Sequence, residues 1–321
     1  MSLLVFGTTW YGWTQLRPLT TGMTTADVID PPAQSPVDEQ NVLVVGLDTR
    51  TDAQGNPLPA EVLEQLHAGS ADDGGDSTDT MIVIHIPAGG GQATAISIPR
   101  DSYVQLAGGF GQHKINSAFA RGKLAAQQQL RGHGVTGAML ETESDRAGAK
   151  TTIQTVEQLT GLTINHYAAV NLVGFSLISQ AVGGVPVCLK APVHDSYSGA
   201  EFPAGPQLVS GPQALAFVRQ RHGLPHGDLD RIQRQQTFLA SMARVILSGD
   251  TLTDSTKRDN LIAAIRKTTV LDKGWDIVGL ARQLQGMGAG DIHFGTIPGV
   301  AISQHTAEDG EAVEVDPRQV L

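Results

Sequence analysis

The chain has 321 residues, 40% of them hydrophobic, and carries a formal net charge of −10. This acidic balance argues against non-specific binding to nucleic acid, because such binding depends on basic residues that neutralise phosphates. The single cysteine, Cys188, excludes an intramolecular disulfide and a cysteine-rich metal site. We therefore expect one main folded domain with extended ends and no nucleic-acid partner.

Residues 1–16 form the first predicted segment. They include the apolar run LLVFGTTWYGWTQL, in which two tryptophans and a tyrosine cluster as in the aromatic belt of a membrane interface. A span needs about twenty apolar residues, and this run is shorter. We interpret it as the outer end of a transmembrane signal anchor whose start is missing; the alternative is an apolar tail packed on the domain. Residues 17–40 contain four prolines, which is typical of an extended linker.

Four short runs rich in β-branched residues predict core strands. They are residues 41–47 (NVLVVGL), 81–86 (MIVIHI), 93–98 (ATAISI) and 292–297 (IHFGTI). Glycines between the second and third runs predict a hairpin. Residues 299–321 are predicted as a polar tail, so the folded domain is expected at residues 41–298.

Helices are expected between these strands. The segments that favour them are residues 117–130, 150–159, 172–182, 212–219 and 231–247. Strands interspersed with helices predict a three-layer α/β/α fold around a central mixed sheet. The polar, glycine-containing segments 53–76 and 131–146 are expected as surface insertions that border a site.

Two aspartates lie next to predicted strands. Asp48 and Arg50 directly follow the first strand, and Asp79 directly precedes the second. If the end of one strand meets the start of the other at one sheet edge, the two carboxylates can bind one divalent cation. Hard oxygen ligands of this kind suit magnesium held together with a phosphate. The alternative is that each aspartate caps a turn.

Two basic residues follow the third strand. Arg100 offers a planar fork that fits phosphate oxygens, and Lys114 offers a point charge. The alternative for them is a surface salt bridge, for instance between Arg100 and Asp101.

The segment FVRQRHGLPHGDLDRIQRQQ, residues 217–236, is the strongest cluster. In an extended segment Arg219 and Arg221 point to the same side. Asp228 or Asp230 can cap the following helix, whose N-terminus favours an anion.

Arg231 and Gln235 extend the same polar surface. Guanidinium groups beside an apolar helix face are costly unless an anion or carboxylates neutralise them, and a diphosphate is the natural candidate. A structural ion-pair network is the alternative. The chain has no Walker A loop, dinucleotide-binding glycine motif, HExxH or G-x-S-x-G elbow, so the enzyme classes that depend on them lose their usual support.

Six segments in order resemble the LytR-CpsA-Psr family from about residue 41 to residue 298. They are NVLVVGLDTR (41–50), TDTMIVIHIP (78–87), AISIPRDSYV (95–104), HKINSAFARG (113–122), AVNLVGFSLISQAVGGVPV (169–187) and FVRQRHGLPHGDLDRIQRQQ (217–236). The long insertion between the two aspartates, residues 52–76, departs from the family pattern, and so does the segment around 131–146.

The resemblance implies an apolar pocket for a polyprenyl chain, with a diphosphate held at its mouth by arginines and by magnesium or manganese. By that resemblance Asp48 and Asp79 are metal ligands, and both are counted as catalytic. The other residues that it implies as catalytic are Arg100, Arg219, Arg221 and Asp228. Those that it implies as diphosphate-binding are Arg50, Arg100, Lys114, Arg219, Arg221, Arg231 and Gln235.

The expected function is then that of a phosphotransferase. It moves a glycopolymer from a polyprenyl-diphosphate carrier onto a peptidoglycan sugar hydroxyl, with diphosphate hydrolysis as a side activity. The resemblance also implies a single membrane span with an extracytoplasmic catalytic domain. Composition points to an actinobacterial source, with arabinogalactan as a cargo. The alternative is a non-catalytic polyprenyl-phosphate-binding or regulatory envelope protein.

Overall fold

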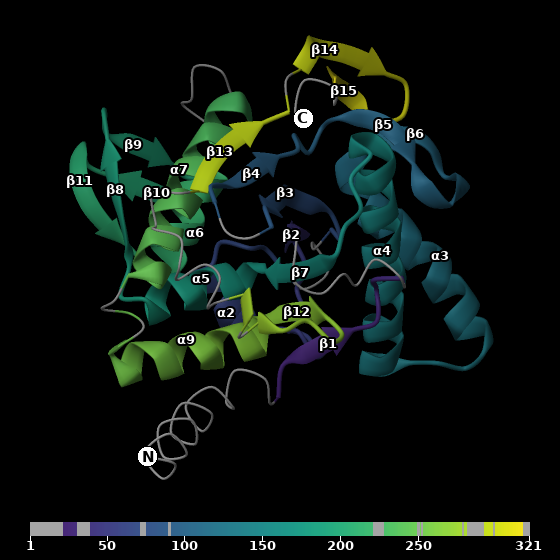
Figure 1. The fold of residues 1–321 in the computed structure, drawn as a ribbon, viewed down its shortest axis with the longest axis horizontal. Helices are drawn as coiled ribbons and strands as arrows, with labels where there is room; N and C mark the ends of the chain where they lie inside the picture. The colour runs from purple at the N-terminus through teal and green to yellow at the C-terminus, as the bar shows by residue number, and fades with distance from the viewer. Residues whose placement is uncertain are drawn as a thin grey trace.

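The fold is a seven-stranded mixed sheet between two layers of helices, as the computed structural model and Figure 1 show. The sheet order is β1-β12-β7-β2-β3-β4-β13, with β2 antiparallel to β3 and parallel to β7. The predicted α/β/α class is confirmed. The structure describes residues 22–30, 39–70, 75–88, 91–220, 228–248, 251, 253–277, 279–280, 292–297 and 299–316.

The central strands coincide with the β-branched runs of the sequence. The hairpin of β3 and β4 is antiparallel, as the intervening glycines predict. The sheet strands are β1 (Thr24–Ala26), β2 (Gln40–Leu47), β3 (Thr78–Ile86), β4 (Ala93–Ser97), β7 (His166–Asn171), β12 (Thr269–Asp272) and β13 (Ile292–Thr296).

One face of the sheet is covered by α3 (Ala118–Gly132) and α4 (Gly137–Thr160). Alternate residues of β2, such as Leu43 and Val45, pack there with Phe119 of α3. α3 and α4 run through the segment 131–146, which was expected as a surface insertion. That segment therefore forms the end of α3, the connecting turn and the start of α4. The side of this helical hairpin that faces the sheet is buried.

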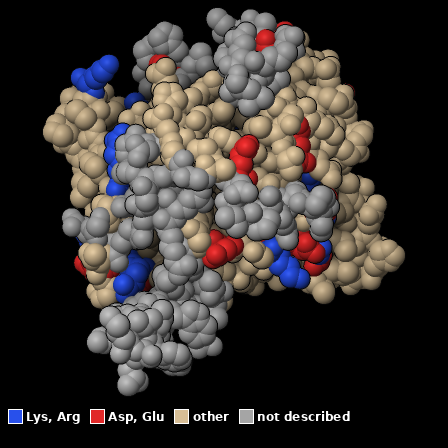
Figure 2. Space-filling view, viewed as in Figure 1, with Lys and Arg blue, Asp and Glu red and all other residues tan. Residues whose placement is uncertain are grey.

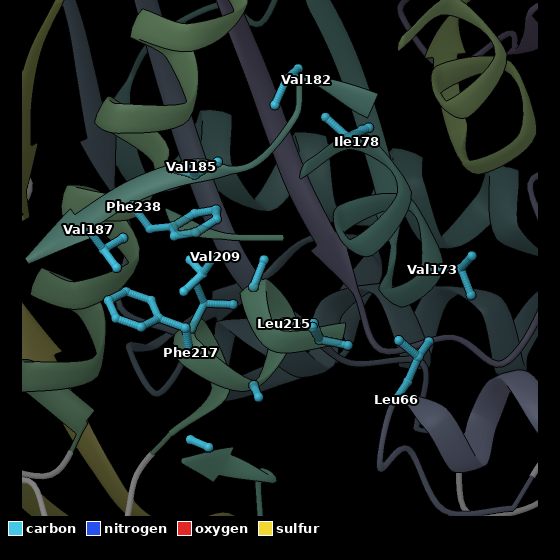
Figure 3. Packing of buried hydrophobic residues seen from close by; sticks show 14 of the residues in the cluster. Leu66, Val173, Ile178, Val182, Val185, Val187, Val209, Leu215, Phe217 and Phe238 are labelled. Atoms are coloured by element: carbon cyan, nitrogen blue, oxygen red, sulfur yellow. The ribbon is translucent and has the colours of Figure 1, made fainter. Parts of the chain in front are cut away.

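The other face is covered by α5 (Leu172–Ala181), α6 (Pro212–Arg219), α7 (Asp228–Leu247) and α9 (Ser255–Thr268). Figure 3 shows the apolar cluster that joins these helices, with Phe217 of α6 beside Phe238 of α7. The centroids of these two rings are 5.8 Å apart. This layer differs from the first because it also encloses a cavity, described below.

Smaller elements complete the described part of the chain. They are α2 (Ala60–Gln65), β5 (Tyr103–Leu106), β6 (Gly111–Lys114), β8 (Val185–Leu189), β9 (Val193–Asp195), β10 (Ala200–Phe202), β11 (Gly205–Val209), β14 (Gly299–Thr306) and β15 (Gly310–Val315), with short 3-10 turns at 107–109 and 115–117.

Two predicted boundaries differ from the structure. Within the expected linker, β1 pairs with β12, and Val28 and Ile29 are buried, because the edge of β12 offers hydrogen bonds that the local sequence does not reveal. In place of the expected polar tail, β14 and β15 form a hairpin, and Asp309 at its turn lies 2.9 Å from His113.

The predicted surface insertion 53–76 also contributes to the core. Leu63 of its helix α2 and Leu66, which directly follows this helix, pack in the apolar cluster of the second layer. The expected anchor, residues 1–16, lies outside the described residues. Among the helices that are described, none combines the length and the apolar composition that a bilayer span needs.

Candidate functional site

A cavity of about 650 Å³ lies between the sheet and the helices of the second layer. Its sheet wall uses side chains at paired register positions, Val44 with Ile82 and Ile84 with Ala95. Most of the lining is apolar. The apolar lining residues beyond these four include Val170, Leu172, Phe175, Ile178, Leu215, Val218, Leu239, Met242, Ala243, Ile246, Ile292 and Phe294.

The polar lining gathers where strands end. Asp48 follows β2, Arg100 follows β4, and Asp79 begins β3, so antiparallel pairing brings all three to one sheet edge. We call this end of the cavity the mouth. Its full polar lining is Asp48, Ser77, Asp79, Thr80, Arg100, Asn171, Asp195, Tyr197, Ser198, Arg219, Arg231 and Gln235. The expected juxtaposition of Asp48 and Asp79 at one edge is therefore found.

Arg50 holds Asp48 in place from outside the cavity. Its Nη1 donates to Oδ1 of Asp48 at 2.8 Å and to the Asp48 carbonyl at 2.7 Å. Its Nε donates to the carbonyl of Ala68 at 2.9 Å. Arg50 is buried and does not line the cavity. It thus ties the insertion to the end of β2, and its predicted contact with a diphosphate stays a prediction.

Arg100 and Asp79 form an ion pair inside the mouth. Nε of Arg100 also lies 3.7 Å from Asp101. Lys114, in contrast, pairs with Asp101 at 3.2 Å and does not line the cavity. For Lys114 the structure therefore shows the salt bridge that the sequence left open as the alternative.

Arg219 reaches the mouth from the end of a helix. It is the last residue of α6, which confirms the helix expected at residues 212–219, so the extended conformation also considered for Arg219 does not apply. Its Nη1 donates to the carbonyls of Leu66 and His67, each at 3.3 Å. These carbonyls accept hydrogen bonds but do not neutralise the guanidinium charge, so an anion in the mouth remains a favourable partner.

Helix α7 supplies the other basic wall. Arg231 is 3% exposed and lines the cavity together with Gln235, whose Nε2 donates to the Val218 carbonyl at 3.2 Å. Arg221 and the side chain of Asp228 lie outside the described residues, although α7 does begin at Asp228. The predicted roles of these two residues stay predictions.

The donor set of the mouth fits a divalent cation. Arg50 and Arg100 each engage Oδ1 of an aspartate, which leaves Oδ2 of Asp48 and of Asp79 for a metal. Magnesium commonly binds one or two carboxylates and completes its shell with water and substrate phosphates. Two carboxylates beside arginines therefore suit a magnesium diphosphate.

A second acidic cluster lies on the opposite face of the sheet and was not expected from the sequence. Asp76, Glu141 and Asp145 have carboxylate oxygens within 4.8 Å of one another. The ammonium of Lys123 bonds to Asp76 at 2.7 Å, to Asp145 at 2.8 Å and to Glu141. Lys123 is 2% exposed, so its ammonium supplies the positive charge at the position that a metal would take.

Sequence reasoning also missed part of the mouth. Asp195, Tyr197 and Ser198 come from the hairpin of β9 and β10, and the only signal for them was a short turn-like stretch, DSYSG. Asn171, for which the sequence offered no role, lines the mouth and caps α5 by accepting a hydrogen bond from the Gly174 amide at 2.8 Å.

The charges of the mouth lie inside a cavity. On the face shown in Figure 2, the described surface charges are scattered and of both signs. Arg231 and Arg100 instead line a largely apolar cavity together with three carboxylates.

Comparison with known proteins gives relatives of one kind. The chain is 46% identical over 282 residues to the cell wall biosynthesis protein LcpA of Corynebacterium glutamicum. The aligned residues make up 87% of this chain and 54% of LcpA. It is 31% identical over 210 residues to a polyisoprenyl-teichoic acid–peptidoglycan teichoic acid transferase, TagU, of Bacillus cereus, covering 65% and 59%. The chain thus spans just over half the length of these relatives.

Solved structures share the fold at low identity. A LytR-Csp2A-Psr enzyme from Actinomyces oris matches with a TM-score of 0.64 and 18% identity, covering 93% of this chain and 94% of that one. TagV of B. subtilis matches with a TM-score of 0.64 and 21% identity, covering 89% and 94%. The model of the LytR_cpsA_psr family matches residues 20–318, and the chain belongs to that family.

Proposed function

We propose that this protein transfers a glycopolymer from a polyprenyl-diphosphate carrier to a sugar hydroxyl of peptidoglycan. The observation that carries the proposal is the division of one cavity into an apolar interior and a mouth with three arginines and three aspartates. The interior matches a hydrocarbon chain, and the mouth matches a diphosphate. TagU of B. cereus, named as a transferase from polyisoprenyl-teichoic acid to peptidoglycan, supports the same substrate class.

In the proposed reaction the acceptor hydroxyl attacks the phosphorus next to the sugar. A new phosphodiester bond forms, the bond to the lipid phosphate breaks, and the lipid monophosphate leaves. The hydroxyl proton passes to a carboxylate, and the two candidates are Asp79 of the mouth and Asp228, at which α7 begins. Water in place of the acceptor gives slow diphosphate hydrolysis.

The residues of the mouth act by position and charge. Arg100, Arg219 and Arg231 orient the phosphoryl oxygens and stabilise the charge that builds up on them during transfer. Asp48 and Asp79 would hold magnesium or manganese, which would neutralise the diphosphate. Arg50 holds Asp48 in place and fastens the insertion at Ala68.

The cellular setting is part of the proposal. The cell wall role named for the C. glutamicum relative supports an envelope protein. We propose a catalytic domain outside the cytoplasm, attached to the membrane through residues 1–16. Arabinogalactan remains the proposed cargo.

Phosphate release from a short-chain prenyl diphosphate tests the proposal. With the full chain in detergent, we expect release with magnesium and its loss with excess chelator. The Arg219→Ala variant is expected to lower kcat/KM by about 100-fold, as for removal of one donor to a developing negative charge. Arg131→Ala, at an exposed position of α3, is the matched control. Tight binding of the lipid without any release would instead favour a carrier or regulatory protein.

A further inference from the structure

The turn between β9 and β10 places a tyrosine at the mouth of the cavity. Tyr197 is 77% exposed and lines the mouth together with Asp195 and Ser198. An isolated exposed apolar side chain is common on proteins and needs no explanation. Tyr197 differs because it lines a largely apolar cavity and because hydrogen bonds to Asp195 hold the turn that carries it.

Asp195 fixes this turn. It is 3% exposed, and its Oδ1 accepts a hydrogen bond from the Tyr197 amide at 3.0 Å. Its Oδ2 accepts a hydrogen bond from the Ser198 hydroxyl at 2.9 Å. A buried carboxylate with these bonds sets the backbone from 195 to 198, so the Tyr197 ring is presented from a rigid base.

The turn is also docked against the arginine site. Gly199 has a φ of +73°, and a Cβ there would lie 2.7 Å from the His67 ring. The carbonyl of the same His67 accepts a hydrogen bond from Arg219 at 3.3 Å. The turn that carries Tyr197 therefore packs against His67, which bonds to Arg219, and both Tyr197 and Arg219 line the cavity.

The chemistry of such a ring matches a sugar. A tyrosine face carries partial negative charge and an apolar surface, and it retains a hydroxyl for hydrogen bonding. One face of a pyranose presents C–H bonds with partial positive charge, so it can stack on the ring while its hydroxyl groups remain in water. With the lipid chain in the interior and the diphosphate at the mouth, the next group outward is a sugar.

We infer that Tyr197, on the turn held by Asp195, is a sugar-binding subsite at the mouth of the cavity. This inference rests on the proposed function. Two sugars could occupy the subsite: the first residue of the glycopolymer attached to the diphosphate, or the acceptor sugar of peptidoglycan. Their shared chemistry is a pyranose that stacks on the aromatic ring.

Substrates with and without a sugar test the subsite. The kcat/KM of the full chain is measured for a short prenyl diphosphate and for the same lipid diphosphate carrying N-acetylglucosamine. If the subsite holds the donor sugar, Tyr197→Ala is expected to lower the ratio of the two values, sugar-bearing over bare, about tenfold, while Tyr197→Phe keeps the ring and the ratio. Leu124→Ala, another exposed apolar position, on α3, is the control.

A second experiment distinguishes a subsite for the donor sugar from one for the acceptor sugar. A peptidoglycan disaccharide is titrated into the wild-type protein and Tyr197→Ala, and its binding is followed by ligand-observed NMR, which needs no turnover. An acceptor subsite predicts that disaccharide binding weakens about tenfold in Tyr197→Ala while the donor ratio is unchanged; a donor subsite predicts the reverse.

An unchanged ratio together with unchanged disaccharide binding overturns the inference. Failure of the wild-type protein to turn over either lipid would contradict the proposed function instead. In that case the disaccharide titration tests the acceptor subsite, and the ratio of the binding affinities for the two lipids, measured in place of kcat/KM, tests the donor subsite.

Discussion

The two faces of the sheet handle positive charge in opposite ways. Behind the sheet, Lys123 is surrounded by Asp76, Glu141 and Asp145, so its charge is matched entirely within the fold. In the cavity, the guanidinium of Arg219 donates to the carbonyl oxygens of Leu66 and His67, which carry no formal charge. We infer from this comparison that the first group serves stability, and we propose that the second is arranged for a ligand that brings its own negative charge.

Removal of Lys123 is expected to have the largest effect. Lys123→Met leaves three carboxylates facing one another without a cation, and such a break of a buried charge cluster costs about 3–5 kcal/mol. Urea denaturation at pH 7 measures the loss in the free energy of unfolding. Lys150→Met is the control, because Lys150 pairs with Asp30 on the surface at 2.8 Å. Equal stability of the two variants would mean that the cluster is not structural.

Removal of Arg219 is expected to act on ligand binding. Saturating pyrophosphate with magnesium should stabilise the wild-type protein by about 2.7 kcal/mol at a ligand concentration of 100 Kd. Arg219→Ala is expected to lose most of this stabilisation, because the anion loses one of its cationic partners. Thermal unfolding with and without pyrophosphate measures the difference, and an undiminished shift in the variant would remove Arg219 from the anion site.

The stability that the Lys123 cluster contributes depends on pH through Asp145. Burial raises the pKa of Asp145 from 3.8 to about 6, helped by Glu141 and Asp76 and opposed by Lys123. A carboxyl with a raised folded-state pKa holds its proton more tightly when folded. Its contribution to stability is therefore full below pH 3.8 and is lost as the pH rises through 6.

The test replaces this carboxyl with an amide. Asp145→Asn does not ionise, so its stability relative to the wild-type protein should rise between pH 4 and pH 7, by about 1–3 kcal/mol. Urea denaturation at both pH values measures the change. A pH-independent difference between the two proteins would show that Asp145 titrates near its ordinary value.

The smallest effect is expected at the surface. Asp30 is 64% exposed in its pair with Lys150. Asp30→Asn should change the free energy of unfolding by less than about 1 kcal/mol, and less still in 1 M salt, because exposed pairs are weak and screened. A loss as large as that of Lys123→Met would mean that exposure does not separate the two kinds of ion pair.

The site residues that the sequence predicted are those marked by a local pattern, whereas groups that only the fold brings together were missed. Asp48, Asp79 and Arg100 were found because each adjoins a strand with a clear hydrophobic pattern, and antiparallel pairing then brought them together. The Lys123 cluster was missed because Lys123 and Asp76 are 47 positions apart, and no periodicity links them.

The same reason explains the other differences. Strand β1 depends on the edge of β12, far along the chain. Arg50 carried the right charge for a diphosphate, but its Nε bonds to Ala68, which the sequence could not reveal. Charge patterns therefore predicted which residues gather at the mouth better than which way each of them points.

Binding of a short-chain prenyl diphosphate and of the prenyl alcohol of equal length tests the central claim most directly. Calorimetry on the wild-type protein should show a strong preference for the diphosphate, because the mouth binds the anion and the interior binds either chain. In Arg219→Ala this preference should fall at least about tenfold, or about 1.4 kcal/mol. Equal affinity of the wild-type protein for the two lipids would contradict the account.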